Sequence, residues 1–535
     1  MDRRQLLLPV LIMLLGAVLR LLFLDIKPPH FDEGINGWFC DQMAIKGYYS
    51  YDPTNYHGPL HFYVLYGFLQ LFGRNLWALR VPVVIVSLLT IFWLFLFRPF
   101  FGRAVTLLAA LGMAISPAFV FYNRYSIHET WLVFFMVLSF WGFLGVSKSE
   151  NPGHWWGLVL GLTGMILTKE TYVIHVASFV IAFALLSILR RFKQGSEERA
   201  EKRPNIPILH LFSAILVGLF LIIFFYSGNF RHWQGLTGLV QSLSPWTKTG
   251  VDAAGHAKTD YDLFPILPQI PAFKVNWYWL KLFSAYEWFA LAGLIFSIRF
   301  WFGGNVGLRL LSIYSAGVLA IYSLIPYKTP WCIISIEWPL LILGGALIVW
   351  IAEHSKKLIA VAVALLLFAQ SAWGMTRLNF FKFDDPKQMY VYVQTFRDYR
   401  KLIDPILEKA SKDPDEYSKM SGLILLSSYF PIPWLLGDFS DVGYYNRDDR
   451  WPKKKDADFV VVDGDLSGEL EKSLTDRYIV VPFRLRDGMD ECRAYFRYDT
   501  FKDVFPNRVP EFDPANPSPA KIENDSDDDM DKSSE

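Results

Sequence analysis

Long apolar stretches recur through the first two thirds of the chain, and they restrict its fold more than any other feature of the sequence. A helix needs about 20 apolar residues to cross a bilayer core of about 30 Å. The stretches that come close to this length are residues 6–24, 76–97, 104–120, 130–147, 155–168, 172–190, 207–227, 284–303, 310–326, 333–352 and 357–375. The sequence therefore predicts an α-helical polytopic membrane protein with about eleven spans.

The composition agrees with a membrane protein that also has one sizeable soluble part. Hydrophobic residues make up 53% of the 535 residues and charged residues 19%, and the charges concentrate in connections and in the last third. The formal net charge is +1, which gives no reason to expect a nucleic acid as partner. Cys40, Cys332 and Cys492 lie far apart and form neither a metal-binding pattern nor a disulfide framework.

Basic residues indicate how the spans are oriented, because cytoplasmic connections carry an excess of lysine and arginine. With Arg3 and Arg4 in the cytoplasm, the densest basic run, at 190–203, also lies inside. The apolar run after Arg4 is long for a signal peptide and no small-residue cleavage site follows it, so we expect a retained signal anchor. The prediction is an integral protein of the cell's inner (plasma) membrane.

The side on which each later connection lies depends on how many spans are counted in two ambiguous segments. Residues 155–190 are interpreted as a helical hairpin that turns at Thr168–Thr171, because one overlong helix would put the basic run at 190–203 outside. Residues 59–72 are short for a crossing and contain tyrosines, so we expect a helix in the outer interface. The resulting odd number of spans places everything after Leu378 outside the cytoplasm.

The last part of the chain has the pattern of a separate α/β domain. After a membrane domain at 1–378, residues 379–512 combine a polar helix-like run with apolar strand-like runs such as DADFVVVDGD and YIVVPFRLRD. We expect this domain to be extracytoplasmic. Residues 513–535 are acidic and poor in apolar residues, which is typical of a disordered tail.

Ionisable residues gather in the connections that this topology places outside. The first of these connections, Pro28 to Tyr63, follows the first span and carries adjacent carboxylates and two histidines. The candidate site residues from all the outer connections are Asp32, Glu33, His57, His61, Arg124, His128, Glu129, Lys169, Glu170, His256, Tyr286, Glu287 and Lys328. Ionisable groups at the edge of a membrane bundle are costly to place and usually functional.

Each of these residues also has a purely structural interpretation. The acids of the first connection could cap helices in a solvated loop. Lys169 and Glu170 could pair across their turn, and Lys328 could extend to the lipid headgroups. Arg124 could form a structural ion pair with Glu129. The functional interpretation gains weight because carboxylates and cations occur together on one side of the membrane.

The mixture of carboxylates and cations suits transfer chemistry on an anionic, lipid-anchored substrate. A carboxylate can take the proton of an acceptor hydroxyl group, and lysine, arginine or histidine can bind a phosphate leaving group. The sequence has no G-x-x-x-x-G-K-[ST] motif and no G-x-G-x-x-G motif after a strand, so it does not indicate a soluble nucleotide site. A lipid-linked donor is the expected alternative.

Several motifs resemble a known class of membrane enzymes. The early span ending in FDEG, then HGPLHFYVLYGFLQLFG, ALRVPVVIVSLL and SPAFVFYNRYSIHETWLVFF, are similar to the N-terminal half of the GT-C glycosyltransferases, which use polyprenyl- or dolichyl-phosphate-linked sugars. The nearest resemblance is to the protein O-mannosyltransferase and aminoarabinose-transferase branch. LTKET, YSLIPYKTPW and MYVYVQT also resemble a prokaryotic subgroup named as flippase-associated. The resemblance covers roughly residues 1–400.

The resemblance implies an inverting glycosyltransferase that passes a sugar from a polyprenyl-phosphate donor to a glycan, lipid or protein acceptor on the extracytoplasmic side. It implies that Asp32 is the general base and that Glu33 and Glu129 complete the catalytic set. From the residues themselves, the expected ligands of the donor phosphate are His57, Arg124, Lys169 and Lys328. The expected supporting residues are His61, His128, Glu170, His256, Tyr286 and Glu287. His57 precedes Gly-Pro-Leu where the aminoarabinose branch has a lysine before Pro-Pro-Leu, so donor handling is expected to differ.

Three alternatives stay open on the sequence alone. A divalent metal is one, because Asp32, His57, His61, His128 and Glu129 offer ligands, but no ligand spacing identifies it. A lipid-linked sugar flippase or transporter is the second, although transporters usually show paired half-repeats and polar residues at mid-membrane. The third is a non-catalytic scaffold that presents the outer domain.

Overall fold

The computed structural model describes residues 3–55, 57–193, 206–251, 263–265, 274–301 and 303–515. The chain divides into two compact units, Met1–Gln394 and Thr395–Glu535. The predicted membrane domain ends sixteen residues earlier, at Leu378, and most of the predicted tail lies outside the described residues. Each unit is described by itself.

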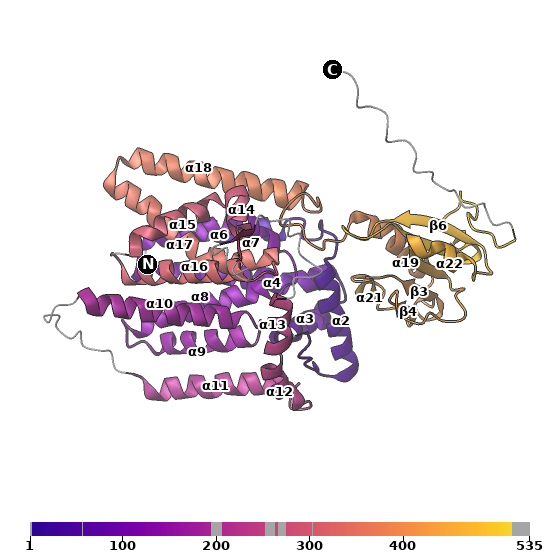
Figure 1. Ribbon diagram of the computed structural model, residues 1–535, viewed down its shortest axis with the longest axis horizontal. Helices are drawn as coiled ribbons and strands as arrows, with labels where there is room; N and C mark the ends of the chain where they lie inside the picture. Colours follow the sequence, from indigo (N-terminus) through magenta and orange to yellow (C-terminus); the bar gives the residue numbers. More distant parts are fainter. Residues whose placement is uncertain are drawn as a thin grey trace, which may run out of the picture. The chain divides into compact units, whose positions relative to one another are not determined.

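Long helices that lie side by side form the first unit (Figure 1). They are α1 (Arg3–Leu21), α4 (Leu76–Phe95), α6 (Arg103–Ile115), α8 (Glu129–Val146), α9 (Pro152–Ile166), α10 (Tyr172–Lys193), α11 (Ile208–Tyr226), α15 (Trp288–Trp301), α16 (Val306–Leu324), α17 (Ile333–His354) and α18 (Lys357–Thr376). Each predicted span coincides with one of these helices. Seven helices among the described residues are long and apolar enough to cross a membrane, and α1, α6 and α15 are shorter apolar helices.

The helix α17 forms the centre of this unit. In the segment Pro330–His354, 89% of the apolar window is buried, compared with 11% in α11 and 22% in the segment Lys357–Phe381. A helix that is apolar on all sides is stable only when it is surrounded, and α17 packs against α6, α15, α16 and α18. The apolar side chains of α11 and α18 remain exposed, as expected for helices that face lipid.

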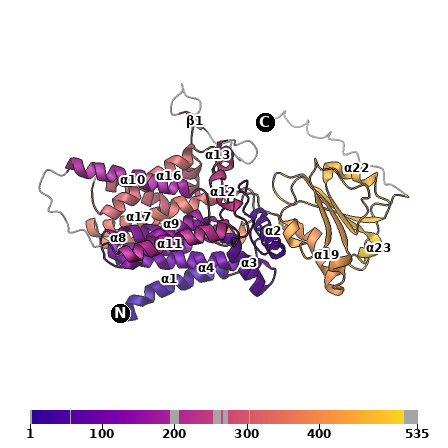
Figure 2. The same cartoon turned by 90° about the horizontal axis from the view of Figure 1, so that it is seen from below.

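Short helices gather at one end of the long ones. They are α2 (Phe31–Lys46), α3 (Leu60–Phe72), α7 (Pro117–Tyr122), α12 (Gln234–Gln241), α13 (Leu243–Val251) and α14 (Tyr278–Tyr286). Figures 1 and 2 both show α2, α3, α12 and α13 at this end. The predicted turn at 168–171 separates α9 from α10, and the predicted helix at 59–72 is α3. Leu263–Pro265 (β1) and Lys274–Asn276 (β2) pair as antiparallel strands.

The second unit is a small α/β domain, as predicted. Its strands are β3 (Ser421–Leu425), β4 (Asp441–Tyr445), β5 (Phe459–Asp463), β6 (Tyr478–Phe483) and β7 (Cys492–Arg497), in the order β4-β3-β5-β7-β6. The strand β3 is parallel to both β4 and β5, whereas β7 is antiparallel to β5 and β6.

Helices cover both faces of this sheet (Figure 2). Because side chains alternate along a strand, Phe459 and Val461 pack in the cluster that includes α19 (Arg400–Lys412). Val460 and Val462 pack on the other face with Leu470 of α22 (Ser467–Glu471). The remaining short helices are α5 (Arg98–Phe101), α20 (Glu416–Lys419), α21 (Ile432–Leu435) and α23 (Tyr498–Phe501).

Candidate functional site

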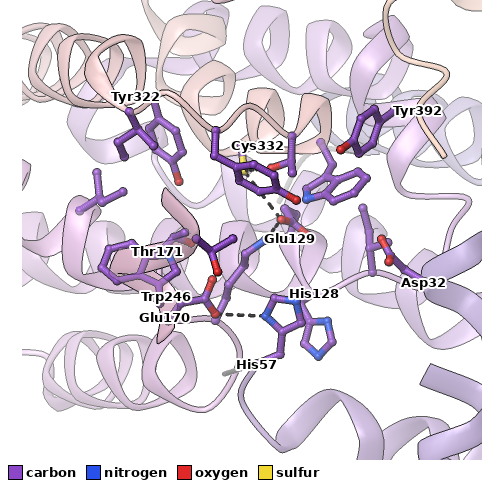
Figure 3. Close-up of a pocket in the computed structure, with 18 of the residues that line it drawn as sticks. Asp32, His57, His128, Glu129, Glu170, Thr171, Trp246, Tyr322, Cys332 and Tyr392 are labelled. Carbon is purple, nitrogen blue, oxygen red and sulfur yellow. Dashed lines mark hydrogen bonds and ion pairs between the residues drawn. The ribbon is translucent and has the colours of Figure 1, made fainter. Parts of the chain in front are cut away.

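A cavity of about 500 Å³ lies in the first unit. Its wall comes from the start of α2, the start of α8, the turn between α9 and α10, the helix α13, and residues 321–332 (Figure 3). These segments are far apart in the sequence, yet they are the outer connections predicted to lie on one side of the membrane. Of the predicted site residues, the cavity is lined by Asp32, His57, His128, Glu129, Lys169 and Glu170.

The N-terminus of α2 places Asp32 at this cavity. His30 is the N-cap residue: its Nδ1 accepts a hydrogen bond from the Asp32 backbone N–H at 3.1 Å, and its own backbone N–H donates to Glu33 Oε2 at 2.9 Å. This capping box fixes the first turn of the helix. The side chain of Asp32 keeps 32% of its surface exposed, so it can meet a substrate.

Glu33 points away from the cavity and is fully buried. Arg80 of α4 donates to it through Nε at 2.8 Å and Nη2 at 2.7 Å, and the Ser126 backbone N–H donates at 2.9 Å. Burial alone would raise the pKa of Glu33, but Arg80 and the backbone N–H donors outweigh burial and lower it. Glu33 therefore ties α2 to α4 and to the connection before α8, and this placement does not support its predicted catalytic role.

Two carboxylates at the cavity have basic side chains as partners. Glu129, at the first residue of α8, bonds the Nζ of Lys169. Glu170 Oε2 lies 3.1 Å from Nδ1 of His57. The Lys169, Glu129 and Glu170 side chains are nearly fully buried, whereas that of His57 is 29% exposed. Lys169 and Glu170 thus do not pair with each other, and Glu129 does not pair with Arg124.

Gly58 allows His57 to reach Glu170. The backbone N–H of Gly58 donates to the Thr168 carbonyl at 3.1 Å, and the Leu60 N–H donates to the Leu167 carbonyl at 3.1 Å. A Cβ atom at position 58 would lie 2.3 Å from the carbonyl of Leu167. Only glycine lets the two backbones come this close. The glycine of the HGPL motif therefore docks the histidine beside the turn between α9 and α10.

Three histidines pack together, and two of them, His57 and His128, line the cavity. The ring of His128 lies 4.7 Å from that of His57 and 4.3 Å from that of His61, measured between centroids. Burial lowers the pKa of His128 well below its usual value, so the ring is neutral. His61 is fully buried and contacts Ser126 and Asn36. Within the described residues, no group of three or more histidine, cysteine or carboxylate side chains could hold a metal ion.

Arg124 and Lys328 lie at helix ends. Arg124 donates to the carbonyls of Leu22 at 2.8 Å and Phe23 at 2.5 Å, just after α1. Lys328 Nζ donates to the carbonyls of Tyr322 and Ile325 at the end of α16. Neither side chain is among those that line the cavity. Their predicted role as phosphate ligands is therefore not supported by this arrangement.

Tyr286 and Glu287 are not among the residues that line the cavity. Glu287 accepts hydrogen bonds from the Ala118 N–H at 2.8 Å and from the Tyr390 hydroxyl at 3.1 Å. The hydroxyl of Tyr286 accepts from the Met389 N–H at 3.2 Å. Both residues thus hold the segment that follows α18. His256 lies outside the described residues.

Sequence reasoning missed an aromatic wall and two partners of the acidic pair. The aromatic side chains that line the cavity include Trp246, Trp279, Tyr322, Tyr327, Trp331 and Tyr392. Figure 3 shows Tyr322 and Tyr392 on the side of the cavity away from His57. The missed partners are His30 and Arg80. A lone arginine within the apolar stretch 76–97 was a usable signal, because a buried cation needs an acidic partner.

One protein family matches the sequence. Its model, described as "Dolichyl-phosphate-mannose-protein mannosyltransferase", matches residues 56–197. This range contains His57, Arg124, His128, Glu129, Lys169 and Glu170. No curated protein matches the chain.

Solved structures match over most of the chain. ArnT from Cupriavidus metallidurans bound to undecaprenyl phosphate is 14% identical, with a TM-score of 0.57 and coverage of 91% of this chain and 97% of that chain. The apo state of ArnT is similar, with a TM-score of 0.54. The archaeal oligosaccharyltransferase AglB from Archaeoglobus fulgidus is 11% identical, with a TM-score of 0.50 and coverage of 89% and 73%. These findings confirm the resemblance expected from the sequence: the chain has the fold of the GT-C glycosyltransferases to which ArnT and AglB belong.

Proposed function

We propose that the protein is a membrane glycosyltransferase that moves a sugar from a polyprenyl-phosphate donor to an acceptor on the extracytoplasmic side. The observation that carries this proposal is the state of the cavity carboxylates. Among the described residues, Glu129 and Glu170 are held by Lys169 and His57, whereas the nearest cationic candidate to Asp32 is His30, at 3.7 Å. Asp32 is therefore the carboxylate best placed to accept a proton.

The proposed reaction is a direct displacement at the anomeric carbon. The acceptor hydroxyl oxygen forms the new bond to this carbon while its proton passes to the Asp32 carboxylate. The bond between the anomeric carbon and the phosphate oxygen breaks, and its electron pair leaves with the polyprenyl phosphate. A single displacement inverts the configuration. A polyprenyl phosphate leaving group needs no protonation, so cations near it are sufficient.

Lys169 and His57 are the proposed ligands of the donor phosphate. Both line the cavity, and both approach it from the turn and the loop that Gly58 holds together. Each side chain already contacts a carboxylate, so a bound phosphate would share Lys169 with Glu129 and His57 with Glu170. The solved ArnT carries undecaprenyl phosphate and the solved AglB carries dolichol-phosphate, which supports a lipid-linked donor for this fold.

The membrane side and the acceptor follow from the same proposal. The positive-inside pattern supports a location outside the cytoplasm for the cavity end of the helices and for the α/β unit, in a protein of the inner (plasma) membrane. The aromatic wall suits the ring of a sugar or another flat apolar face. The acceptor is a glycan, a lipid or a protein, and the AglB structures with bound peptides support the last of these by analogy only.

The test is a sugar-transfer assay in membranes that contain the protein. A radiolabelled polyprenyl-phosphate hexose is supplied, and label is followed into lipid, glycan and protein fractions. We expect transfer with the wild type and a large loss with Asp32→Asn. Movement of the labelled lipid across proteoliposomes without transfer would instead favour the flippase alternative. Neither transfer nor movement would leave only the scaffold alternative.

A further inference from the structure

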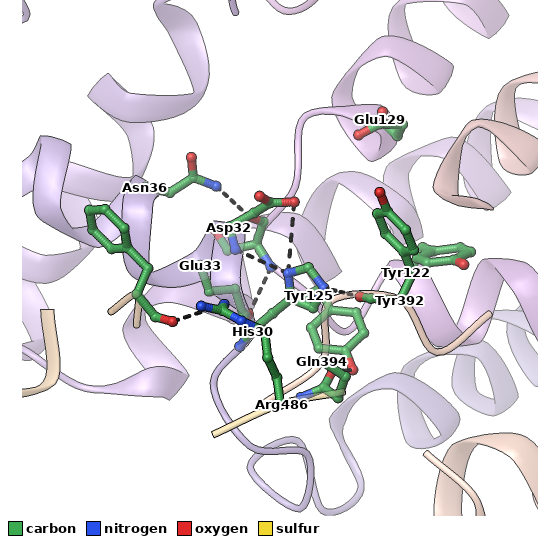
Figure 4. A network of polar contacts seen from close by, with 12 residues as sticks. His30, Asp32, Glu33, Asn36, Tyr122, Tyr125, Glu129, Tyr392, Gln394 and Arg486 are labelled. Carbon is green, nitrogen blue, oxygen red and sulfur yellow. Dashed lines mark hydrogen bonds and ion pairs between the residues drawn. The ribbon is translucent and has the colours of Figure 1, made fainter. Parts of the chain in front are cut away.

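We infer that His30 is a positioning residue for Asp32, and that residues 389–394 hold His30 in the required orientation; this inference rests on the proposed function. His30 lies between the two. Its Nδ1 faces the backbone N–H of Asp32 at 3.1 Å, and its Nε2 lies 2.8 Å from the carbonyl of Tyr392 (Figure 4). The side chain is only 6% exposed, so these contacts are not shared with bulk water.

The two contacts define which nitrogen of His30 carries the proton. A backbone N–H can only donate, so Nδ1 must accept and is unprotonated. A carbonyl can only accept, so Nε2 must carry the proton. Only the neutral Nε2–H tautomer satisfies both partners. In this form Nδ1 has no proton to donate to the Asp32 carboxylate 3.7 Å away, and the ring carries no positive charge. The carboxylate therefore stays available to a substrate.

Residues 389–394 are fixed to the bundle on both sides of Tyr392. The Tyr122 hydroxyl donates to the Tyr390 carbonyl at 3.0 Å. Gln394 accepts from the Tyr125 hydroxyl and donates to the Pro28 carbonyl at 3.2 Å. These anchors determine where the Tyr392 carbonyl can lie, and so where the ring of His30 points.

The backbone of this segment is strained next to the cavity. Val393 has φ of 44°, a conformation that a β-branched residue rarely adopts. Such conformations persist only where many surrounding contacts hold the backbone in place, and they concentrate at functional sites. Val393 and Tyr392 both line the cavity. The strain at Val393 is what we expect if residues 389–394 are held in place to orient His30. The chain continues from this segment into the second unit at Thr395.

Three substitutions at His30 separate its two contacts. His30→Asn keeps an acceptor near the Nδ1 position and thus the cap of α2, because asparagine is a good N-cap residue. His30→Gln keeps a donor near the Nε2 position. His30→Ala removes both contacts. We expect the Ala variant to lose about tenfold or more in kcat, since small misplacements of a reacting group are costly. The Asn and Gln variants should lose less, and KM for the donor should change little in all three. His354→Ala, at an exposed histidine that bonds its own helix, is the matched control.

A double-mutant cycle with Asp32→Asn distinguishes positioning from a general structural role. If His30 acts through Asp32, its substitution should cost almost nothing further once Asp32 is replaced. Undiminished loss in the Asp32→Asn background, or unchanged kcat in His30→Ala, overturns the inference. If the Ala variant does not fold, the cycle is run with His30→Asn, whose helix cap is intact. Absence of transfer by the wild type would instead refute the proposed function.

Discussion

Asp32 and Glu33 are adjacent in the sequence but have opposite surroundings. The first turn of α2 directs Asp32 toward the cavity and Glu33 into the protein, where Arg80 binds it through two nitrogens. A bidentate pair with a buried arginine fixes a carboxylate and leaves it little capacity to accept a further proton. The different surroundings of these two adjacent carboxylates are therefore a consequence of helix geometry.

We expect Asp32→Asn to lower kcat by about 10²-fold or more, because the substitution removes the general base while keeping size and polarity. Donor KM should change little, since the proposed phosphate ligands are Lys169 and His57. Asp32→Glu should recover little activity, because an added methylene displaces the oxygens. Asp41→Asn, on the same helix and paired with Arg74, is the matched control. Near-normal transfer by a folded Asp32→Asn variant would require another base, with Glu129 the next candidate.

The buried pair of Lys169 and Glu129 predicts separable effects on stability and on donor binding. Lys169→Met leaves Glu129 as an uncompensated buried charge, which should cost about 3–5 kcal/mol in the free energy of unfolding. Adding Glu129→Gln should restore much of the thermal stability in detergent. Donor binding, measured by titration, should stay weak in the double variant because the phosphate ligand is still missing. Wild-type donor affinity in that variant would assign Lys169 a structural role alone.

At the scale of single elements, the end of α16 depends on the charge state of Lys328. Burial lowers the pKa of Lys328 to about 7, although its amine bonds the last carbonyls of the helix. Its pKa in the unfolded chain is about 10.4. Between these two values the unfolded state binds more protons than the folded state, so stability rises with pH in this window.

We therefore expect Lys328 to make the thermal unfolding midpoint of the wild type rise with pH between about pH 7 and pH 10. Lys328→Met should lack this rise. The measurement is the difference between the two midpoints at each pH, which cancels the groups that they share. The difference should favour Lys328→Met most at the acid end of the window and shrink as pH rises. A difference that is constant across this range would contradict the assigned state of Lys328.

The close contact between Gly58 and the turn between α9 and α10 can be tested without changing a functional side chain. Gly58→Ala puts a Cβ atom against the Leu167 carbonyl, so the two backbones must separate. We expect donor KM to rise several-fold and thermal stability to fall, because His57 no longer meets Glu170 properly. Gly67→Ala is the matched control, since a Cβ there meets nothing within 4 Å and alanine favours the helix α3. Equal behaviour of the two variants would contradict the docking role of Gly58.

At the scale of the whole molecule, the sequence predicted the helices better than the contacts between them. Each predicted span coincides with a helix because length and apolar composition are local properties. The outer connections were expected on one side, and the cavity contains residues from several of them. The α/β unit was also predictable, since its strands alternate with a clear helical pattern.

The pairing of buried charges was not predictable from local pattern. Arg80 bonds a carboxylate 47 positions earlier, and His30 bonds a carbonyl 362 positions later. Arg124 was expected at the phosphate but bonds the carbonyls after α1. A buried charge needs a partner of opposite polarity, but any such group within reach will serve. The three-dimensional packing therefore determines which residue becomes the partner. The sequence indicates that a buried charge must have a partner, but it does not indicate which residue that partner is.

The membrane orientation of the whole molecule can be tested on residues at opposite ends of one helix. The helix α8 begins with Glu129 at the cavity and ends at Val146, and its 18 residues give it a length of about 27 Å. Position 150, in the connection after it, should therefore lie on the opposite side of the membrane from the cavity. The basic residues of the inner connections, including Lys148, predict that this side is the cytoplasm.

We expect a cysteine at position 150 to resist impermeant thiol reagents in intact cells and to react after permeabilisation. A cysteine at position 415, in the second unit, should react in intact cells. The native background is suitable because Cys40, Cys332 and Cys492 are all buried. Labelling at position 150 in intact cells would place the cavity on the cytoplasmic side, where nucleotide-activated sugars are available. The case for a lipid-linked donor would then lose its topological support, even if Asp32 proved to be the base.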